Sequence, residues 1–202
     1  MIDSLVRVSD MPTLKLPIVG DRILIQNPSP EEISELYEIE SDPKTKSHLG
    51  GGHLNSQRDE WIAKMTGHCC PSGLREKSFR PNCPLAIALK ESRAVIGRAK
   101  LQYAALAREN CTDLQGEWQL EVVISAKFWG SKLGEETAKC LSSAAFANYE
   151  MPALYAVVHP ENTASMTMAQ KLGFVKDGVQ ASSEVEPRHL IYKLTRQGHS
   201  NA

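Results

Sequence analysis

Two segments of the sequence hold most of the residues whose types and spacing could do chemistry. The first runs from Glu121 to Glu136 as EVVISAKFWGSKLGEE. An apolar strand there leads into a turn that contains Gly130 and then into a helix whose early turn contains Gly134. Such a junction leaves backbone N–H groups without partners and adds the positive end of the helix dipole. The segment therefore predicts a binding site for a pyrophosphate.

The second segment runs from Val157 to Phe174 as VVHPENTASMTMAQKLGF and also passes from a strand into a helix. Asn162 precedes the helix and can cap it, and Gly173 is the matching stop at the other end. Ser165 follows Asn162 by about one helical turn, so both side chains can lie on the same face. The pattern fits helix-end hydrogen bonds and ligand contact equally well, and the two roles are compatible.

The elements that must position these segments follow from hydrophobic periodicity and from turn and cap signals. Strands are expected at residues 22–26, 85–89, 94–103, 118–124, 153–158 and 190–194, with one more from residue 174 onward. Helices are expected at residues 31–39, 56–65, 131–148 and 162–172. The predicted order is β-α-α-β-β-β-α-β-α-β-β, which is an α/β (α+β) domain.

The first segment resembles the acetyl-CoA-binding motif of the GNAT superfamily of N-acetyltransferases, and the second resembles the strand-to-helix element that follows it there. Trp129, Gly130, Gly134 and Glu136 fall where the RimJ/RimL-like branch (ribosomal-protein alanine N-acetyltransferase-like) has Trp, Gly, a small residue and Glu. One residue departs from the pattern. Lys132 replaces the glycine usual in the middle of the loop, and lysine adopts positive φ less readily than glycine.

The resemblance implies the GNAT fold, a central, splayed, mixed but mostly antiparallel sheet of about seven strands flanked by about four helices. The pantetheine arm of acetyl-CoA, the cosubstrate, would lie between the strands at 118–124 and 153–158. The backbone around Val123 to Ser125 would pair with the pantetheine amides, and an N–H there would polarise the thioester carbonyl. The residues implied in binding acetyl-CoA are Val123, Ile124, Ser125, Trp129, Gly130, Ser131, Lys132, Leu133, Gly134, Asn162 and Ser165.

The activity that the resemblance implies is direct transfer of acetyl to a primary amine within one ternary complex. In many relatives a tyrosine protonates the departing CoA thiolate, but its place is taken here by Ala169, and we assign that role to Ser165. Glu121 and Glu117 are favoured over His159 as the general base, with Glu121 ahead because it lies nearer the thioester. Strand alternation puts both glutamates on one face unless a bulge intervenes.

Other functions stay open on the sequence alone. The Lys132 replacement and the absence of a decisive base keep open a GNAT fold that binds CoA or an acyl-CoA as a regulatory module without catalysis. A nucleotide-phosphate enzyme is a weak alternative, because the residues around Gly130 lack the P-loop spacing. The acceptor, a protein N-terminus or a small-molecule amine such as a polyamine, amino acid or antibiotic, is not identified, and residues 44–84 are expected to shape its site.

The five cysteines are an odd number, and we expect reduced thiols rather than disulfides. No cysteine has a recognisable partner that would make it a nucleophile. Adjacent cysteines cannot easily ligate one tetrahedral ion, so the group His68, Cys69, Cys70 and Cys83 does not predict a zinc site. We therefore expect no metal.

Length and charge set the remaining limits. With 202 residues and 42% hydrophobic content, the chain suits one domain, which we place at residues 21–196, between an N-terminal extension at 1–20 and a flexible tail at 197–202. The 23 basic residues nearly balance 24 acidic ones, which gives no footprint for nucleic acid. No apolar run suits a signal peptide or a membrane span. We expect a soluble, cytoplasmic protein, with a homodimer as an open alternative to a monomer.

Overall fold

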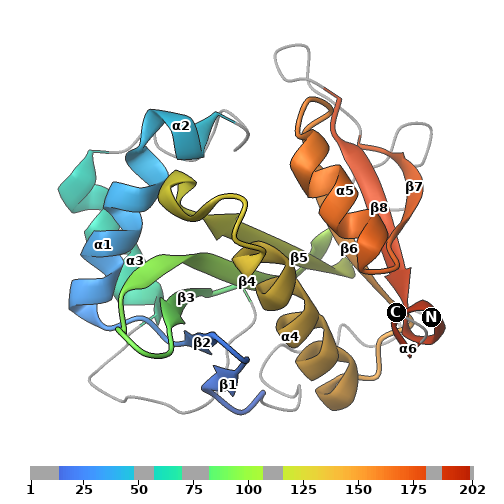
Figure 1. Cartoon of the computed structure of the whole chain (residues 1–202), viewed down its shortest axis with the longest axis horizontal. Coiled ribbons are helices and arrows are strands. Elements are labelled where there is room, and N and C mark those ends of the chain that lie inside the picture. Colours follow the sequence, from blue (N-terminus) through green and yellow to red (C-terminus); the bar gives the residue numbers. More distant parts are fainter. Residues whose placement is uncertain (1–13, 48–56, 70–81, 107–115, 181–187, 201–202) are drawn as a thin grey trace, which may run out of the picture.

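The computed structural model describes residues 14–47, 57–69, 82–106, 116–180 and 188–200. Within them, eight strands form one sheet in the order β1-β2-β3-β4-β5-β6-β8-β7. Every neighbouring pair is antiparallel except β5 and β6. The strands, which extend across Figure 1 from β1 at the lower left to β7 at the right, are β1 (Ile18–Val19), β2 (Ile23–Gln26), β3 (Pro84–Leu89), β4 (Val95–Ala105), β5 (Gly116–Ile124), β6 (Ala153–Val158), β7 (Val175–Val179) and β8 (Leu190–Thr195). The sheet is mixed and mostly antiparallel, as predicted.

Helices cover both faces of this sheet. They are α1 (Pro30–Ser41), α2 (Pro43–Lys46), α3 (Arg58–Cys69), α4 (Leu133–Asn148), α5 (Thr163–Lys171) and α6 (Arg196–Ser200), with a short 3-10 turn, η3, at Ala126–Phe128. Ala86 of β3 packs in the cluster of α1 and α3, whereas its neighbours Leu85 and Ile87 pack in the larger cluster that contains α4. Because successive strand residues point to opposite faces, α4 and the α1–α3 pair lie on opposite sides of the sheet.

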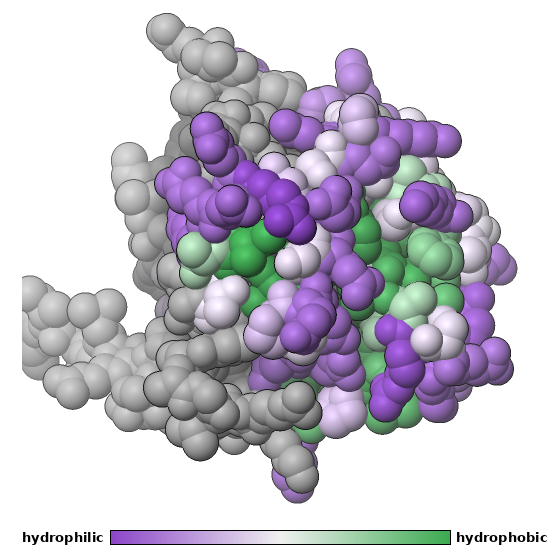
Figure 2. All heavy atoms as spheres, turned by 90° about the vertical axis from the view of Figure 1, so that its left-hand side faces the viewer, coloured by the Kyte–Doolittle hydropathy of each residue, from purple (hydrophilic) through white to green (hydrophobic). Residues whose placement is uncertain are grey.

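The helices turn their apolar faces inward. In α4 the buried positions include Leu133, Leu141 and Ala145, which recur at helical spacing. On the side of the molecule that carries α1 to α3, hydrophilic side chains predominate and apolar patches lie between them (Figure 2). None of the helices in the described ranges is long and apolar enough to cross a membrane.

The parallel pair opens the sheet. Gln119 of β5 and Tyr155 of β6 form the bridge that joins these two strands. By contrast, β5 pairs with β4 from Gly116 to Ile124, and β6 pairs with β8 from Ala153 to Val158. Each strand is thus fixed to its outer neighbour, and the carboxyl-terminal halves of β5 and β6 are left to part from each other. This is the splay that the resemblance to the GNAT fold predicts.

The predicted elements are confirmed in type and order, with ends that shift by a few residues. Four short elements were not predicted, namely β1, α2, η3 and α6. Residues 14–19, expected within an extension, belong to the domain, because Leu14 and Leu16 are buried in the main core and β1 pairs with β2. Much of the expected tail is the helix α6. Large parts of the segment expected to shape the acceptor site, at 48–56 and 70–81, lie outside the described residues, as do Cys70 and Cys111.

Candidate active site

The gap between β5 and β6 leads into two adjoining cavities. The one at the start of α4, which we call the helix cavity, has a volume of about 380 Å³ and is lined by Thr45, Val122, Val123, Ile124, Phe128, Trp129, Gly130, Lys132, Leu133, Gly134, Glu135, Glu161, Asn162, Thr163, Ala164, Ser165 and Met168.

The other cavity, which we call the sheet cavity, has a volume of about 500 Å³. Its lining is Lys100, Gln102, Gln119, Leu120, Glu121, Val122, Val123, Ala138, Ala156, Val157, Val158, His159, Asn162, Ser165, Met168, Ala169, Leu172, Phe174, Gln180 and His189. The two cavities share Val122, Val123, Asn162, Ser165 and Met168, so they meet between the parted strands and the start of α5. Each volume is in the range of small-molecule sites.

The start of α4 is unusual among the helices because no side chain caps it. Side chains of Ser29, Asp42 and Asn162 cap α1, α2 and α5. In α4 the first intrahelical bond runs from the Glu136 N–H to the Lys132 carbonyl. Within the described ranges, no protein group accepts from the N–H groups of the preceding first-turn residues, 133–135, all of which line the helix cavity. Donors without partners and the positive end of a helix dipole together suit a bound anion.

The loop before α4 contains two residues in the left-handed region. Gly130 has φ +78° and Lys132 has φ +64°. The expectation that Lys132 occupies a position suited to glycine is therefore confirmed, and the conformation costs a lysine about 1 kcal/mol or more. Lys132 is exposed and lines the helix cavity.

A set of hydrogen bonds fixes the loop between β5 and α4. The indole Nε1 of Trp129 donates to the carbonyl of Ile124 at 2.9 Å. Trp129 is 45% exposed, and the centroid of its ring lies 5.8 Å from the Lys44 ammonium. The N–H of Ala126 donates to the Thr45 hydroxyl at 3.0 Å. Thr45 in turn donates to Asp42 through both its N–H and its hydroxyl, and these bonds lower the pKa of Asp42. The unpredicted helix α2 thus holds the loop from the far side.

The backbone of β5 corrects one detail of the predicted site. The N–H of Ser125 donates to the Ile96 carbonyl at 2.8 Å within the β4–β5 ladder, so it is not available to a ligand. Because backbone groups alternate in direction along an antiparallel strand, Val123 also faces β4, whereas Val122 and Ile124 face the gap. Of the three residues expected to pair with pantetheine, Ile124 alone has this orientation, and Val122 joins it. Strand pairing, which the sequence does not contain, decides this.

Glu121 lies on the floor of the sheet cavity and is held by a buried arginine. Its carboxylate accepts from Arg98 Nη2 at 2.8 Å, and Arg98 Nε donates to Glu40, which is itself buried. Burial alone would lower the pKa of Arg98, but the charges of Glu121 and Glu40 outweigh it and raise that pKa. The permanent guanidinium fixes the Glu121 carboxylate in one orientation, facing a cavity that Lys100 and Gln102 also line.

Glu117 lies elsewhere. It precedes the bridge between Gln119 and Tyr155, where β5 and β6 are still joined, and it lines neither cavity. The regular β4–β5 register confirms that Glu117 and Glu121 share one face of the strand. Burial, and secondarily the nearby Glu117, raise the pKa of Tyr155, with Lys193 acting in the opposite direction. The structure therefore brings Glu121 to the cavities and keeps Glu117 beside Tyr155.

Asn162 and Ser165 lie where the two cavities meet. The Asn162 side chain accepts from the Ser165 N–H at 3.0 Å, which confirms Asn162 as the cap of α5. The Ser165 hydroxyl bonds to no protein group in the described parts of the chain and is half-buried at the junction. Ser165 is thus positioned to contact a ligand that spans both cavities.

His159 lines the sheet cavity, but its Nδ1 accepts from the Glu161 N–H at 3.2 Å. A neutral ring in this arrangement carries its proton on Nε2, so neither nitrogen offers a free lone pair to an amine. This geometry supports the preference for a carboxylate as base. The ring of His189 lies 5.4 Å from that of His159.

None of the cysteines in the described ranges lines either cavity. Cys140, on α4, lines neither of them, and burial followed by the nearby carboxylates of Glu136 and Asp21 raises the pKa of its thiol. A raised pKa lowers the thiolate fraction and hence the nucleophilicity. Among the residues described, no group of three or more histidine, cysteine or acidic side chains could hold a metal ion.

The lining also contains residues that sequence reasoning missed. Met168, on α5, lies close to the start of α4, and Thr45 comes from an unpredicted helix. Lys100 and Gln102 come from β4, and His189 comes directly before β8. No local signal in the sequence marks these side chains, because long-range strand pairing brings them together. Alternation along residues 94–103 would have placed Lys100 and Gln102 on one face.

Comparison with known proteins identifies the fold and the family. The family model for the acetyltransferase (GNAT) domain matches residues 22–175. A GNAT-family acetyltransferase from Bacillus anthracis superposes with a TM-score of 0.69 at 14% identity, covering 90% of this chain and 99% of that one. A putative ribosomal-protein-serine acetyltransferase from Vibrio cholerae gives 0.64 at 15% identity, covering 91% and 99%. Spermidine N-acetyltransferase from Vibrio cholerae, in complex with CoA and spermine, gives 0.67 at 11%, covering 90% and 100%. At these identities the structures share the fold. The family match, which spans most of the chain and both segments of the site, shows that this protein belongs to the GNAT acetyltransferases.

Proposed function

We propose that the protein transfers an acetyl group from acetyl-CoA to a primary amine by direct attack within a ternary complex. The observation that carries the proposal is the uncapped start of α4, whose free N–H groups line a cavity that continues between the parted strands β5 and β6. An anion and an extended arm could both be bound there. Acetyl-CoA combines a pyrophosphate with such an arm.

The residues present fit this cosubstrate. The N–H groups of Leu133, Gly134 and Glu135 would bind the pyrophosphate, assisted by the helix dipole. The backbone of Val122 and Ile124 faces the gap where the pantetheine amides would pair. Trp129, Gly130, Lys132, Asn162 and Ser165 are predicted residues that also line the cavities, and we assign them to the same site. Ser131, which was predicted with them, lines neither cavity.

Two side chains are proposed to move protons. The amine nitrogen attacks the thioester carbonyl carbon, a C–N bond forms and the C–S bond breaks. Glu121 would take up the proton that the amine loses, directly or through water. Ser165 would hydrogen-bond the departing thiolate and relay a proton to it, since a serine hydroxyl is too weak an acid to act alone. Reactants held side by side supply much of the rate.

The acceptor amine would enter through the sheet cavity, which holds Glu121 and is lined by further polar side chains. We assign the protein to the RimJ/RimL-like branch on Trp129, Gly130, Gly134 and Glu136, which resemble the motif of that branch in sequence. A protein N-terminus is the acceptor that this assignment favours over a free small-molecule amine.

The test is release of CoA thiol from acetyl-CoA by the purified protein, measured with and without a panel of peptides and small amines. We expect release to depend on the amine and mass spectrometry to find acetylated product. Binding of CoA without amine-dependent release across the panel would instead support a non-catalytic CoA-binding module. A protein that does not bind CoA would contradict the assignment of the site itself.

A further inference from the structure

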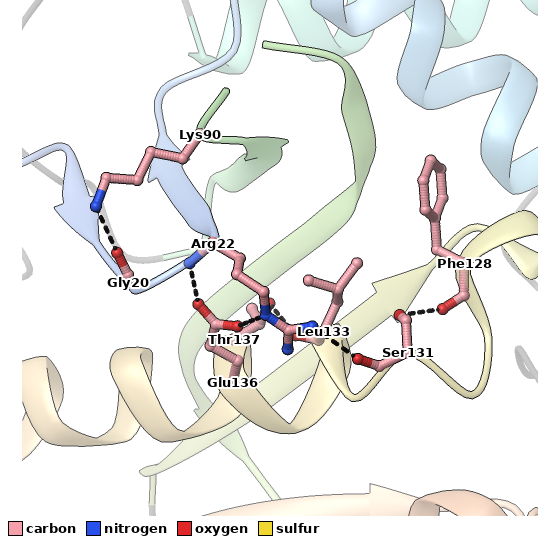
Figure 3. A network of polar contacts seen from close by, with 8 residues as sticks. All are labelled: Gly20, Arg22, Lys90, Phe128, Ser131, Leu133, Glu136 and Thr137. Atoms are coloured by element: carbon pink, nitrogen blue, oxygen red, sulfur yellow. Dashed lines mark hydrogen bonds and ion pairs between the residues drawn. The ribbon is translucent and has the colours of Figure 1, made fainter. Parts of the chain in front are cut away.

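Arg22, just before β2, makes three directed contacts with the start of α4 although more than 100 residues separate them in sequence. Its N–H donates to Glu136 Oε1 at 2.7 Å, its Nε donates to Glu136 Oε2 at 2.8 Å, and its Nη1 donates to the Ser131 carbonyl at 3.0 Å. Figure 3 shows these bonds between the β2 strand and the loop that leads into α4. One residue thus holds both the loop and the helix.

The backbone around Arg22 is itself fixed. Its carbonyl accepts from the Lys90 N–H at 2.8 Å, and the Lys90 ammonium donates to the Gly20 carbonyl at 3.2 Å (Figure 3). A Cβ atom at Gly20 would lie 2.8 Å from Glu136 Oε1 and 2.8 Å from Ile23 Cγ1, so a side chain there would displace the carboxylate that Arg22 bonds. Arg22 therefore reaches the loop from a rigid base.

The Arg22–Glu136 ion pair is a poor source of global stability. The Arg22 side chain is 52% exposed, and exposed pairs contribute little because water screens them. Its geometry is nevertheless specific, since a planar guanidinium bonds a carboxylate and a carbonyl at once. The contacts are better explained by local positioning than by stabilisation of the whole fold.

The carbonyl that Arg22 holds lies between the two left-handed residues of the loop, Gly130 and Lys132. In a trans peptide the C=O and the following N–H point in opposite directions. With the Ser131 carbonyl directed at Arg22, the Lys132 N–H points away from it. Figure 1 shows β2 and α5 on opposite sides of α4, and the helix cavity lies on the α5 side. The bond to Ser131 thus keeps the loop in the conformation that presents its N–H groups to the cavity.

We propose that Arg22 is a positioning residue for the phosphate site, holding the loop in its ligand-binding form before the cosubstrate arrives. The inference rests on the proposed function. Lysine at position 132 disfavours the ligand-binding form of the loop, and the hydrogen bonds of Arg22 stabilise that form. Without Arg22 the loop leaves its ligand-binding form in most molecules. The apparent affinity for the cosubstrate then falls in proportion to the fraction of molecules that keep this form.

The experiment measures CoA affinity by calorimetry for wild type, Arg22→Gln, Lys132→Gly and the double variant. We expect Arg22→Gln to raise the Kd about fivefold, and the KM for acetyl-CoA similarly, with kcat at saturation within about twofold, because bound ligand restores the loop. In the Lys132→Gly background the same change should raise the Kd less than about twofold, because glycine adopts positive φ readily. Arg58→Gln, which breaks an exposed ion pair with Glu38 on α1, is the matched control. It should change neither the Kd for CoA nor the KM for acetyl-CoA.

An Arg22→Gln protein with unchanged Kd would overturn the inference, and so would an equal loss in both backgrounds, since Arg22 would then not act through the loop. Arg22→Lys, which keeps the charge but lacks the guanidinium fork, serves as the second variant if the glutamine protein does not fold, and it should also raise the Kd. A wild-type protein that does not bind CoA would contradict the proposed function. If wild type binds CoA but the Arg22→Gln change has no effect, or the same effect in both backgrounds, only the role of Arg22 is contradicted and the proposed function stands.

Discussion

Ser165 lies where the helix and sheet cavities meet. Its surroundings distinguish two roles that the sequence alone leaves open, hydrogen bonding at the helix end and contact with the ligand. The cap of α5 is the side chain of Asn162, to which Ser165 donates only its backbone N–H. The serine hydroxyl is thus not required to cap the start of α5. A role in protonating the thiolate is open to it.

Ser165→Ala should therefore lower kcat by about a hundredfold with little change in the Kd for CoA, since a general acid acts in the transition state and not in binding. Single-turnover kinetics would isolate the chemical step from product release. Asn162→Ala is the matched comparison. It should lower stability by about 1 kcal/mol through loss of the cap, an effect that Ser165→Ala should not share. Near wild-type turnover in the Ser165→Ala protein would mean that the thiolate takes its proton from solvent and not from Ser165.

Glu121 and Glu117 offer a comparison within one strand. Both were candidates for the base, and they lie on the same face, but only Glu121 lines a cavity. We predict that Glu121→Gln lowers kcat about a hundredfold and that Glu117→Gln lowers it less than about threefold. Steady-state kinetics at saturating acetyl-CoA and amine would measure this. A larger loss for Glu117→Gln than for Glu121→Gln would remove Glu121 from the mechanism.

At the scale of elements, the loop between β5 and α4 has a strained backbone at the candidate binding surface. Lys132 occupies a left-handed conformation at the very residue that precedes an uncapped helix. Side chains cap the helices α1, α2 and α5, and α4 differs from them in having none. The strain and the missing cap occur together at the candidate phosphate site.

Lys132→Gly should raise the free energy of unfolding by about 0.5–1 kcal/mol, because relief of the left-handed lysine exceeds the added entropy of a glycine in the unfolded chain. Lys132→Ala keeps the strain and should give no such gain. Both variants lose the ammonium, so both should raise the KM for acetyl-CoA and weaken its dependence on salt if that charge contacts a phosphate. Urea denaturation measures the first effect. Equal stability of the glycine and alanine proteins would contradict the strain.

The sequence was informative where structure is local. The turn at Gly130, the cap at Asn162 and the stop at Gly173 each depend on a few neighbouring residues, and the structure confirms them. Ser125 and Thr45 could not be placed in this way. The direction of the Ser125 N–H depends on its pairing with Ile96 in another strand, and Thr45 reaches Ala126 across 81 residues of sequence. Such placements are products of tertiary contacts rather than of propensity.

At the scale of the whole molecule, one sheet joins both ends of the described chain to the site. Tyr149, at the end of α4, is buried in the main core that also contains Leu14 and Tyr192. Burial raises the pKa of Tyr149 to about 12, although its interaction with the Leu14 backbone acts in the opposite direction. The N-terminal segment therefore helps to enclose an ionisable group.

This predicts a specific loss of stability at high pH. A phenol whose pKa is near 10 in the unfolded chain and about 12 in the folded protein contributes stability below pH 10 that is lost as the pH rises toward 12. The loss can reach roughly 2–3 kcal/mol. Unfolding free energies between pH 9 and about 12, compared with those of Tyr149→Phe, would isolate it because other groups titrate equally in both proteins. Parallel pH profiles for the two proteins would contradict the burial of this hydroxyl.

The central claim is that the start of α4 binds the cosubstrate's phosphates, and Gly134 tests it most directly. A Cβ atom there would lie 3.5 Å from Ile124 and 3.6 Å from Met168, which is ordinary contact, so the protein accommodates this atom. Because Gly134 lines the helix cavity, the larger valine side chain would take up space that the ligand needs. Gly178→Val, at a strand position with open space around it, is the matched control. Calorimetric titration with CoA should show that wild type and Gly178→Val bind alike and that folded Gly134→Val binds at least about tenfold more weakly. Unchanged affinity in a folded Gly134→Val protein would contradict the account.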